Sequence, residues 1–457
     1  MKIDTPLKLQ DLRKPLRRFF ELAVQKITAL DRRWDPAQGT PVFTVDGAYT
    51  TRGWTEWTQG FQFGCALLAF DATGERRMLK LGRQRTIERM APHVTHVGVH
   101  DHGFNNVSTY GNLRRLARES RFACSDGEMR FYEMALKASG AVQAARWSRI
   151  ADGTGYIHSF NGPHSLFVDT IRTVRALMVS HDLGHVLMGE NDQPHNLLHR
   201  GVQHIVNTLK YNVYYGEGRD AFDVPGRTCH EAVFNMTDGN FRCPSTQQGY
   251  SPFSTWTRGL AWAMLGCAEE LQFLATLPDR VDLGGPTRKQ FAAMLLRAAR
   301  ATADFYIANT SADGIPVWDT GAPGVAAMGD YTAAPADPYN DHEPYDSSAA
   351  AITAQGLIRL GDYLAKAGRK KQAARYTQAG LTTAAALLDE PFLSTKARHQ
   401  GLILHSIYHR PNGWDHVPPG RTVPCGESSM WGDYHAMELA VLLQRKLDRK
   451  PYLTFFA

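Results

Sequence analysis

The stretch LRRFFELAVQKITAL (residues 16–30) indicates which kind of fold the chain adopts. Its apolar side chains recur three or four positions apart: Leu16, Phe19, Phe20, Ala23, Ile27 and Leu30. That spacing places them on one face of an α-helix, where they can pack against a core. Residues 291–305 repeat the pattern, and 347–367, 372–388 and 433–447 are helical in composition. We therefore expect a mostly helical protein.

Long loops rich in glycine, proline, asparagine and aromatic residues separate these helices, at 211–253, 309–345 and 390–430. Loops of this length in a compact domain are usually functional or disordered. Their tryptophan, tyrosine and histidine content argues against disorder. No shift in composition marks a linker, so we expect residues 1–457 to form a single domain. The length accommodates twelve helices with their connections, as it would any helical architecture of similar count.

The composition excludes several classes of function. The 51 basic and 45 acidic residues are interspersed and give a net charge of only +6, so nucleic acid is a poor candidate partner. No run of about 18 apolar residues indicates a membrane span, and no signal peptide is visible. The six cysteines contain no CxxC pair, which favours a reducing compartment and argues against zinc. We expect a cytoplasmic protein, or a periplasmic one if a signal peptide was removed.

The segment VGVHDHGFNN (residues 97–106) is the first candidate site. It places a carboxylate, Asp101, between His100 and His102, with a glycine directly after them. Such a turn is polar and tight enough to face a substrate. The alternative is an Asx-type turn or a helix cap with no role in chemistry.

The segment SLFVDTIRTVRAL (residues 165–177) is the second. Asp169 follows three apolar residues, and desolvation there would raise its pKa. A carboxylic acid that stays protonated near neutral pH can serve as a general acid. The alternative is a salt bridge to Arg172 or Arg175, three and six positions further along, of which Arg172 is well placed for it on a helix.

The densest cluster of polar and aromatic residues lies between residues 227 and 266. Tryptophan faces stack on sugar rings, while arginine and glutamine bind carboxylates and hydroxyls. Aromatic core packing is the alternative for each tryptophan. Ser254 or Thr255 is expected to cap a helix that starts between the tryptophans. The cluster contains His230, Gln248, Trp256, Arg258 and Trp262.

Two further segments look like loops that enter helices. We expect Asp346 to cap the alanine-rich helix that follows it, which is a structural role. In GESSMWGDYHAMEL (residues 426–439) a helix is expected to begin near Gly432–Asp433. The backbone of Ser428–Ser429 would then be free to line a site.

Taken in order, these segments resemble the unsaturated glucuronyl hydrolases, glycoside hydrolase family 88, and their relatives acting on unsaturated rhamnogalacturonan. The resemblance lies in the order of the motifs across most of the chain. The matching segments are WTQGFQFG (57–64), HDHGF (100–104), SLFVDT (165–170), RTCH (227–230), TQQGYSPFSTWTRGLAWAM (246–264), PYDSSAAAITAQGL (344–357) and GESSMWGDYHAMEL (426–439).

The resemblance implies an all-α fold, an (α/α)6 barrel of six helical hairpins with its active site in loops at one mouth. It also implies the substrate, an acidic oligosaccharide with a Δ4,5-unsaturated uronic acid at its non-reducing end, as polysaccharide lyases produce. The reaction is hydration of a vinyl ether: a proton goes to C4, water adds to C5, and the resulting hemiketal opens and releases the neighbouring sugar. No cofactor and no metal take part. The number of subunits is left open.

The residue roles follow from the same match. Asp169 would act as acid toward C4 and base toward water, and Asp101 would bind substrate and help to keep Asp169 protonated. The tryptophans would stack on the sugars, His230 would orient hydroxyl groups or water, and Gln248 and Arg258 would contact the ring and its carboxylate. The matched substrate-binding positions are Trp57, His100, His230, Gln248, Trp256, Arg258 and Trp262.

Two features depart from the family. Where family members place two methionines and an asparagine, this chain has Thr170, Ile171, Arg172 and Thr173. If Arg172 faces the site, it would lower the pKa of Asp169 or bind a further anion. The histidine-rich segment 181–204 is also unusual, but it lacks the spacing of a metal motif. Two alternatives stay open: the same barrel hydrolysing a saturated or modified sugar by another mechanism, and a glycan-binding protein without turnover.

Overall fold

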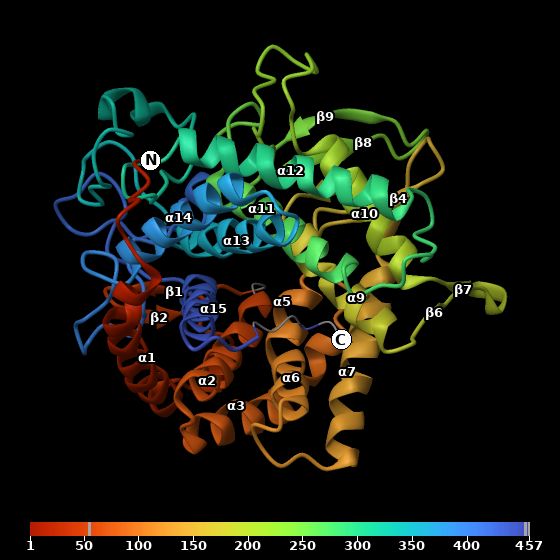
Figure 1. Ribbon diagram of the computed structural model, residues 1–457, viewed down its shortest axis with the longest axis horizontal. Helices are drawn as coiled ribbons and strands as arrows, with labels where there is room; N and C mark the ends of the chain where they lie inside the picture. The colour runs from red at the N-terminus through yellow and green to blue at the C-terminus, as the bar shows by residue number, and fades with distance from the viewer. Residues whose placement is uncertain (54–55, 452–454, 456–457) are drawn as a thin grey trace.

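Six inner helical segments form a closed ring in the computed structural model, which describes residues 1–53, 56–451 and 455. Each contacts the next, and α15 closes the ring by contacting α2. Figure 1 shows the chain passing round this ring from the red N-terminal helices to blue α15. The inner segments are α2 (Gln59–Thr73), α5 (His102–Asn106) continued by a π-helical turn and α6 (Asn112–Arg118), α8 (Thr170–Thr173) with α9 (Arg175–Asp182), α11 (Thr257–Leu274), α13 (Ser347–Lys366) and α15 (Met430–Leu447).

Six outer helices cover the ring, so the described residues form an (α/α)6 barrel and that prediction is confirmed. The outer helices are α1 (Arg13–Arg33), α3 (Arg76–Arg89), α7 (Asp126–Ala145), α10 (Leu197–Tyr211), α12 (Arg288–Ala308) and α14 (Lys370–Leu387). Short helical turns join them: Leu9–Leu12, Pro36–Gln38, Glu56–Thr58, α4 (Ala91–Val94), the π-helical turn Val107–Gly111, Glu190–Asp192, Pro323–Met328 and Arg410–Asn412.

The inner and outer helices differ in how much of their surface is buried. Inner helix α11 is buried on all sides except at Gln272, whereas outer helix α1 buries one face. That face contains the predicted residues except Ile27, which is half-buried, and also Val24 and Lys26. The predicted helices at 347–367 and 372–388 are α13 and α14. Asp346 caps α13 as expected, because its Oδ1 accepts the N–H of Ser348 at 3.0 Å.

Two predicted helix starts need correction. Helix α15 begins at Met430 rather than near Gly432, because the hydroxyl of Ser429 accepts the N–H of Gly432 at 3.1 Å and caps the helix there. Helix α11 begins at Thr257, and neither Ser254 nor Thr255 caps it. The hydroxyl of Thr255 instead accepts the N–H of Thr228 at 3.2 Å, which ties the preceding loop to the helix start.

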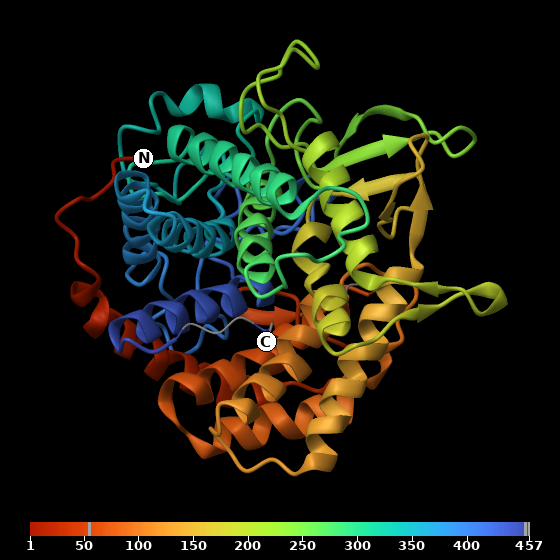
Figure 2. The ribbon, with the colours of Figure 1, turned by 45° about the vertical axis from the view of Figure 1, so that its right-hand side comes forward.

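Short antiparallel strands lie in the connections between helices (Figure 2). The predicted loop 211–253 contains two of them, because Phe234 and Ala232 pack with Leu166 and Tyr156 in a small apolar cluster beside the barrel. The pairs are β1 (Phe43–Val45) with β2 (Ala48–Thr50), β3 (Trp147–Arg149) with β4 (Gly155–Ile157), β5 (Ser165–Phe167) with β8 (Glu231–Phe234) and β9 (Phe241–Ser245), and β6 (Leu187–Met188) with β7 (Pro194–His195).

None of the described helices combines the length and the apolar character that crossing a bilayer demands.

Buried histidines make the stability of the protein depend on pH. Burial lowers their pKa values to about 3 or 4, so in the folded state they stay neutral while the unfolded chain binds protons near pH 6.5. The contribution of these neutral histidines to the free energy of unfolding is therefore fully present above about pH 6.5, and it is lost as the pH falls toward 4. The residues are His93, His102, His204, His230, His405, His409 and His435.

We expect the melting temperature to fall by several degrees between about pH 7 and pH 5. Buried Asp319, Asp415 and Asp433 act in the opposite direction, because burial raises their pKa values to about 6, but they are fewer than the histidines. Differential scanning fluorimetry across this range checks the prediction. A melting temperature that stays constant or rises on acidification would contradict it.

Candidate active site

The N-terminal ends of the inner helices meet at one mouth of the barrel. Asp101 directly precedes α5, Asp169 precedes α8, and Trp256 precedes α11. These residues line a single cavity that opens to solvent at the mouth of the barrel. Because helix N-termini carry partial positive charge, this mouth favours an anionic ligand.

A close approach between two inner helices brings the two aspartates together. A Cβ on Gly103 would lie 2.1 Å from the carbonyl oxygen of Thr173, so only glycine lets α5 pack this tightly against α8. The hydroxyl of Thr173 donates to the carbonyl oxygen of His100 at 2.6 Å. The glycine of the HDHGF segment thus sets the distance between the segments that carry Asp101 and Asp169.

His100 lies between the two carboxylates. Its Nε2 is 3.3 Å from Oδ1 of Asp169 and 3.7 Å from Oδ1 of Asp101. All three side chains are buried, with at most about a tenth of each exposed. A buried imidazole in contact with two carboxylates is held in its charged form, and the pKa of His100 is raised although burial alone would lower it.

The proton distribution differs from the sequence-based prediction. Burial alone would raise the pKa of Asp169, but the hydrogen bond and charge of His100, together with the charge of Arg258, outweigh it and lower that pKa. Burial and the neighbouring Asp169 raise the pKa of Asp101. In this structure Asp169 is thus the carboxylate, and the adjacent His100 is the protonated partner.

His230 lies directly behind the cavity lining. Its Nδ1 accepts the backbone N–H of Gln247 at 3.0 Å, which assigns the ring proton to Nε2. That Nε2 is buried and has no hydrogen-bond partner among the described residues. Its ring packs against Phe167 and Trp256, at 4.2 and 4.8 Å between ring centres. Because burial lowers its pKa to about 4, His230 is a neutral N–H donor next to Asp169.

Arg258 makes its contacts with protein groups. Its guanidinium donates to Oδ2 of Asp346 at 3.3 Å and to Oε1 of Gln248 at 2.8 Å. It also donates to the backbone carbonyls of Ile407 and Tyr408. Arg258 therefore fixes the Gln248 side chain and the 407–408 backbone at the cavity wall. Asp346, expected only as a helix cap, serves as its ion-pair partner as well.

The three predicted tryptophans all line the cavity. Trp57 stacks on Trp431, with ring centres 5.0 Å apart and planes at 26°. Trp256 and Trp262 are 3% and 2% exposed, so most of their surface is core packing, as the alternative interpretation held. Trp262 contacts Phe104 at 4.9 Å between ring centres. Of the predicted residues, all except His230 lie in the lining itself.

Sequence reasoning missed one wall of the cavity. Tyr408, His409 and Trp414 line it from the loop 390–430, which was identified as aromatic-rich without any residue being singled out. Asp415 fixes the backbone of this wall, because its carboxylate accepts hydrogen bonds from the backbone N–H groups of Tyr408 and His409 at 2.5 and 3.1 Å. The remaining residues of the lining that were not predicted are Val99, Phe104, Phe160 and Gln247.

Arg172 points away from the site and into the barrel core. Its guanidinium pairs with Glu269 at 2.8 Å and with Glu438 at 3.0 Å, and no part of its side chain is exposed. The alternative of an Asp169–Arg172 salt bridge is therefore wrong, and Arg172 binds no substrate anion. In the histidine-rich segment, Nδ1 of buried His204 accepts the N–H of Ile157, and the described histidines there form no metal-like group.

Comparisons with known proteins find relatives that match most of the chain, although no protein-family model matches the sequence. An unsaturated glucuronyl hydrolase from Bacillus sp. (strain GL1) is 26% identical over 392 residues, covering 86% of this chain and 87% of that protein. An unsaturated chondroitin disaccharide hydrolase from Streptococcus agalactiae is 20% identical over 407 residues, covering 87% and 84%.

Solved structures show the same fold. The crystal structure of the unsaturated glucuronyl hydrolase from Bacillus sp. GL1 superposes with a TM-score of 0.69 and 21% sequence identity. The match covers 93% of this chain and 95% of that one. The resemblance seen in the order of the motifs is thus confirmed, and the chain is a relative of the unsaturated glucuronyl hydrolases of glycoside hydrolase family 88.

Proposed function

We propose that the protein is a glycoside hydrolase that removes a Δ4,5-unsaturated uronic acid from the non-reducing end of oligosaccharides made by polysaccharide lyases. The observation that carries this proposal is the buried Asp101–His100–Asp169 cluster, at the barrel mouth where the inner helix N-termini meet. Those termini favour an anionic sugar. The aromatic lining offers surfaces on which sugar rings can stack. Relatives that cover most of the chain have names that match this activity.

The chemistry is hydration of the vinyl ether formed by C4, C5 and the ring oxygen. The Nε2 proton of His100 passes to Asp169, which gives it to C4 while the C4=C5 electron pair forms the new C4–H bond. Positive charge then develops at C5 and the ring oxygen, and Asp169, again a carboxylate, takes a proton from the water that attacks C5. The hemiketal opens by breaking the bond from C5 to the ring oxygen, and the hemiacetal left at C1 releases the neighbouring sugar.

The surrounding residues position the substrate. Asp101 accepts hydrogen bonds from sugar hydroxyls, and the Nε2–H of His230 donates to a hydroxyl or to the attacking water. Gln248 contacts the ring, and Arg258 acts mainly by fixing Gln248 and the wall at 407–408. We assign Trp57 to stacking on a sugar, with Trp256 and Trp262 forming the cavity floor.

Two further features belong to this proposal. Residues 1–457 act as one catalytic domain, since each inner helix of the described ring contacts the next. The protein works in the cytoplasm, where its six cysteines, all free in this structure, stay reduced.

The proposal is tested with a panel of lyase-generated unsaturated disaccharides that contains glucuronyl, iduronyl, sulfated and rhamnogalacturonan-derived members. The ultraviolet absorbance of the conjugated double bond should decay with the wild-type enzyme on at least one member. The member that decays fastest identifies the preferred neighbouring sugar. Absence of decay on every member would contradict the proposal and favour a saturated or modified sugar as substrate.

A further inference from the structure

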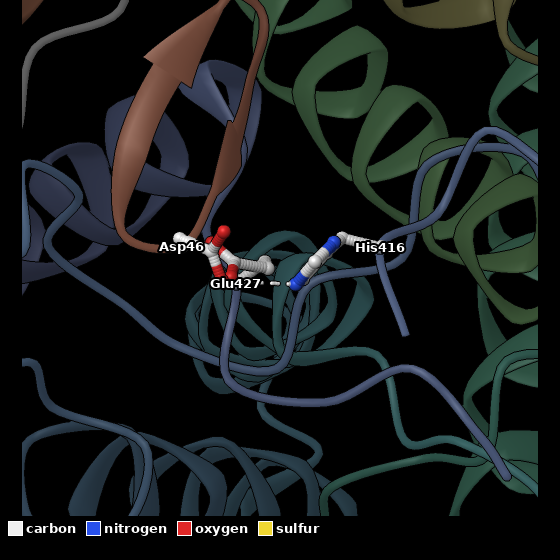
Figure 3. Close-up of side chains that lie close together, drawn as sticks. All are labelled: Asp46, His416 and Glu427. Atoms are coloured by element: carbon white, nitrogen blue, oxygen red, sulfur yellow. Dashed lines mark ion pairs between the residues drawn. The ribbon is translucent and has the colours of Figure 1, made fainter. Parts of the chain in front are cut away.

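Outside the substrate cavity, three potential metal ligands come together from separate segments. Asp46 is at the tip of the β1–β2 hairpin, while His416 and Glu427 flank the segment that leads into α15. One ligand atom from each lies within 4.8 Å of the others. Figure 3 shows the imidazole edge of His416 directed toward the two carboxylates.

The contact between His416 and Asp46 lacks the geometry of a hydrogen bond. Nε2 of His416 is 3.2 Å from Oδ1 of Asp46, yet this nitrogen is buried and has no hydrogen-bond partner among the described residues. Two ligands of one tetrahedral or octahedral ion, each about 2.1 Å from it, are about 3.0–3.4 Å apart. The separation therefore fits two donors that share an ion.

Glu427 is held in place by contacts that leave one oxygen available. Its side chain is 7% exposed, and its Oε2 accepts the hydroxyl of Thr44 and, at 3.2 Å, the N–H of Gly47. No hydrogen bond from a described residue reaches Oε1. Outer contacts of this kind orient carboxylate ligands in metal sites.

Neither carboxylate of this cluster forms an ion pair with a lysine or an arginine of the described residues, although Lys396 and Arg398 line the same hollow. Among the described residues, the ion-pair contacts of Asp46 and Glu427 are with histidines only. The histidine next to Glu427 is His399, whose Nε2 is 3.8 Å from Oε2 of Glu427 and donates to the carbonyl oxygen of Gly426 at 3.1 Å. Exposed Asp46, half-buried His416 and buried Glu427 thus bring two carboxylates and one imidazole together, an arrangement that a dication stabilises.

We propose that Asp46, His416 and Glu427 bind one divalent transition-metal ion, Zn²⁺ or Mn²⁺, with water at the remaining positions. One imidazole nitrogen with two carboxylate oxygens suits these ions better than Ca²⁺ or Mg²⁺, which prefer oxygen ligands alone. The ion ties the hairpin tip to a segment two residues from Trp414, and so stiffens that wall of the substrate cavity. It takes no part in the reaction.

Isothermal titration of chelator-treated full-length protein with ZnCl₂ and, separately, MnCl₂ tests this site. We expect one ion per chain for at least one metal, together with a higher melting temperature when that metal is present. Asp46→Asn and His416→Gln should each weaken binding by about ten-fold or more. Asparagine suits the left-handed backbone at position 46, where φ is 51°, so this variant should fold normally.

The matched controls are Asp192→Asn and His195→Gln, in and beside the β6–β7 hairpin, which should bind like the wild type. If both cluster variants bind as tightly as the wild type, or if neither metal binds, the proposal is wrong. These results are independent of the sugar reaction, because metal binding is measured without substrate. Failure here would leave the proposed hydrolase activity unaffected.

Discussion

Asp169→Asn is expected to lower kcat by about 10²- to 10⁴-fold while leaving substrate affinity close to that of the wild type. Asparagine keeps the shape of the side chain, and its carbonyl oxygen can still accept the hydrogen bond that His100 Nε2 makes with Asp169 at 3.3 Å. It cannot carry the proton that must reach C4 or remove one from water. Steady-state decay of the double-bond absorbance measures kcat, and calorimetry with the preferred disaccharide measures affinity.

The control for this variant is Asp238→Asn, which removes an exposed carboxylate in the turn between β8 and β9. It should leave both kcat and affinity unchanged. If Asp169→Asn kept more than about a tenth of the wild-type kcat, Asp169 would not be the proton donor. Asp101, the other carboxylate in contact with His100, would then be the candidate proton donor.

Arg172→Met is expected to lower the free energy of unfolding by about 3–5 kcal/mol, the largest stability effect that the structure indicates. Arg172 is fully buried at the centre of the barrel and pairs with Glu269 and Glu438. Removing its charge leaves two buried carboxylates without their main counter-ion. Arg172 and Arg175 hold the pKa of Glu438 at about 2, so this carboxylate stays charged. Urea-induced unfolding monitored by circular dichroism measures the change.

An exposed ion pair provides the matched control for Arg172. Arg297 pairs with Glu217 at the surface, where each side chain is about half exposed. Arg297→Met should therefore cost less than about 1 kcal/mol. The double variant Arg172→Met, Glu438→Gln should be less destabilised than the two single variants summed, since it removes one of the unpaired charges. Equal stability of Arg172→Met and Arg297→Met would contradict the role of the buried network.

The sequence predicts the helices because helix periodicity is local, whereas the barrel is implied only by the resemblance to a known family. Fifteen residues, 16–30, are enough to predict the buried face of α1. Asp346 directly precedes α13, which is the position of a helix cap. The approximate site is also predictable, because its residues precede or begin the inner helices, and the order of the motifs follows the ring. Eight of the nine predicted residues line one cavity, and His230 lies directly behind it.

What the sequence does not predict depends on contacts between distant segments. The pKa of Asp169 is lowered by His100, which is 69 positions away in the chain. The guanidinium of Arg258 donates to the carboxylate of Asp346 and to the backbone carbonyls at 407–408, which are about 88 and 150 positions away in the chain. Arg172 looked like a charge at the active site because it is three residues from Asp169, but the helix turns it toward Glu438 in the core.

The central claim is that Asp169 protonates C4 and that water adds to C5. Its most direct test is to run the wild-type reaction in D₂O on the preferred unsaturated disaccharide and to examine the product at once by NMR spectroscopy. The account predicts one deuterium at C4 in a single configuration, formed at the rate at which the double-bond absorbance decays. Release of the neighbouring sugar with the C4=C5 bond intact and no deuterium at C4 would show direct cleavage at C1, and would contradict the account.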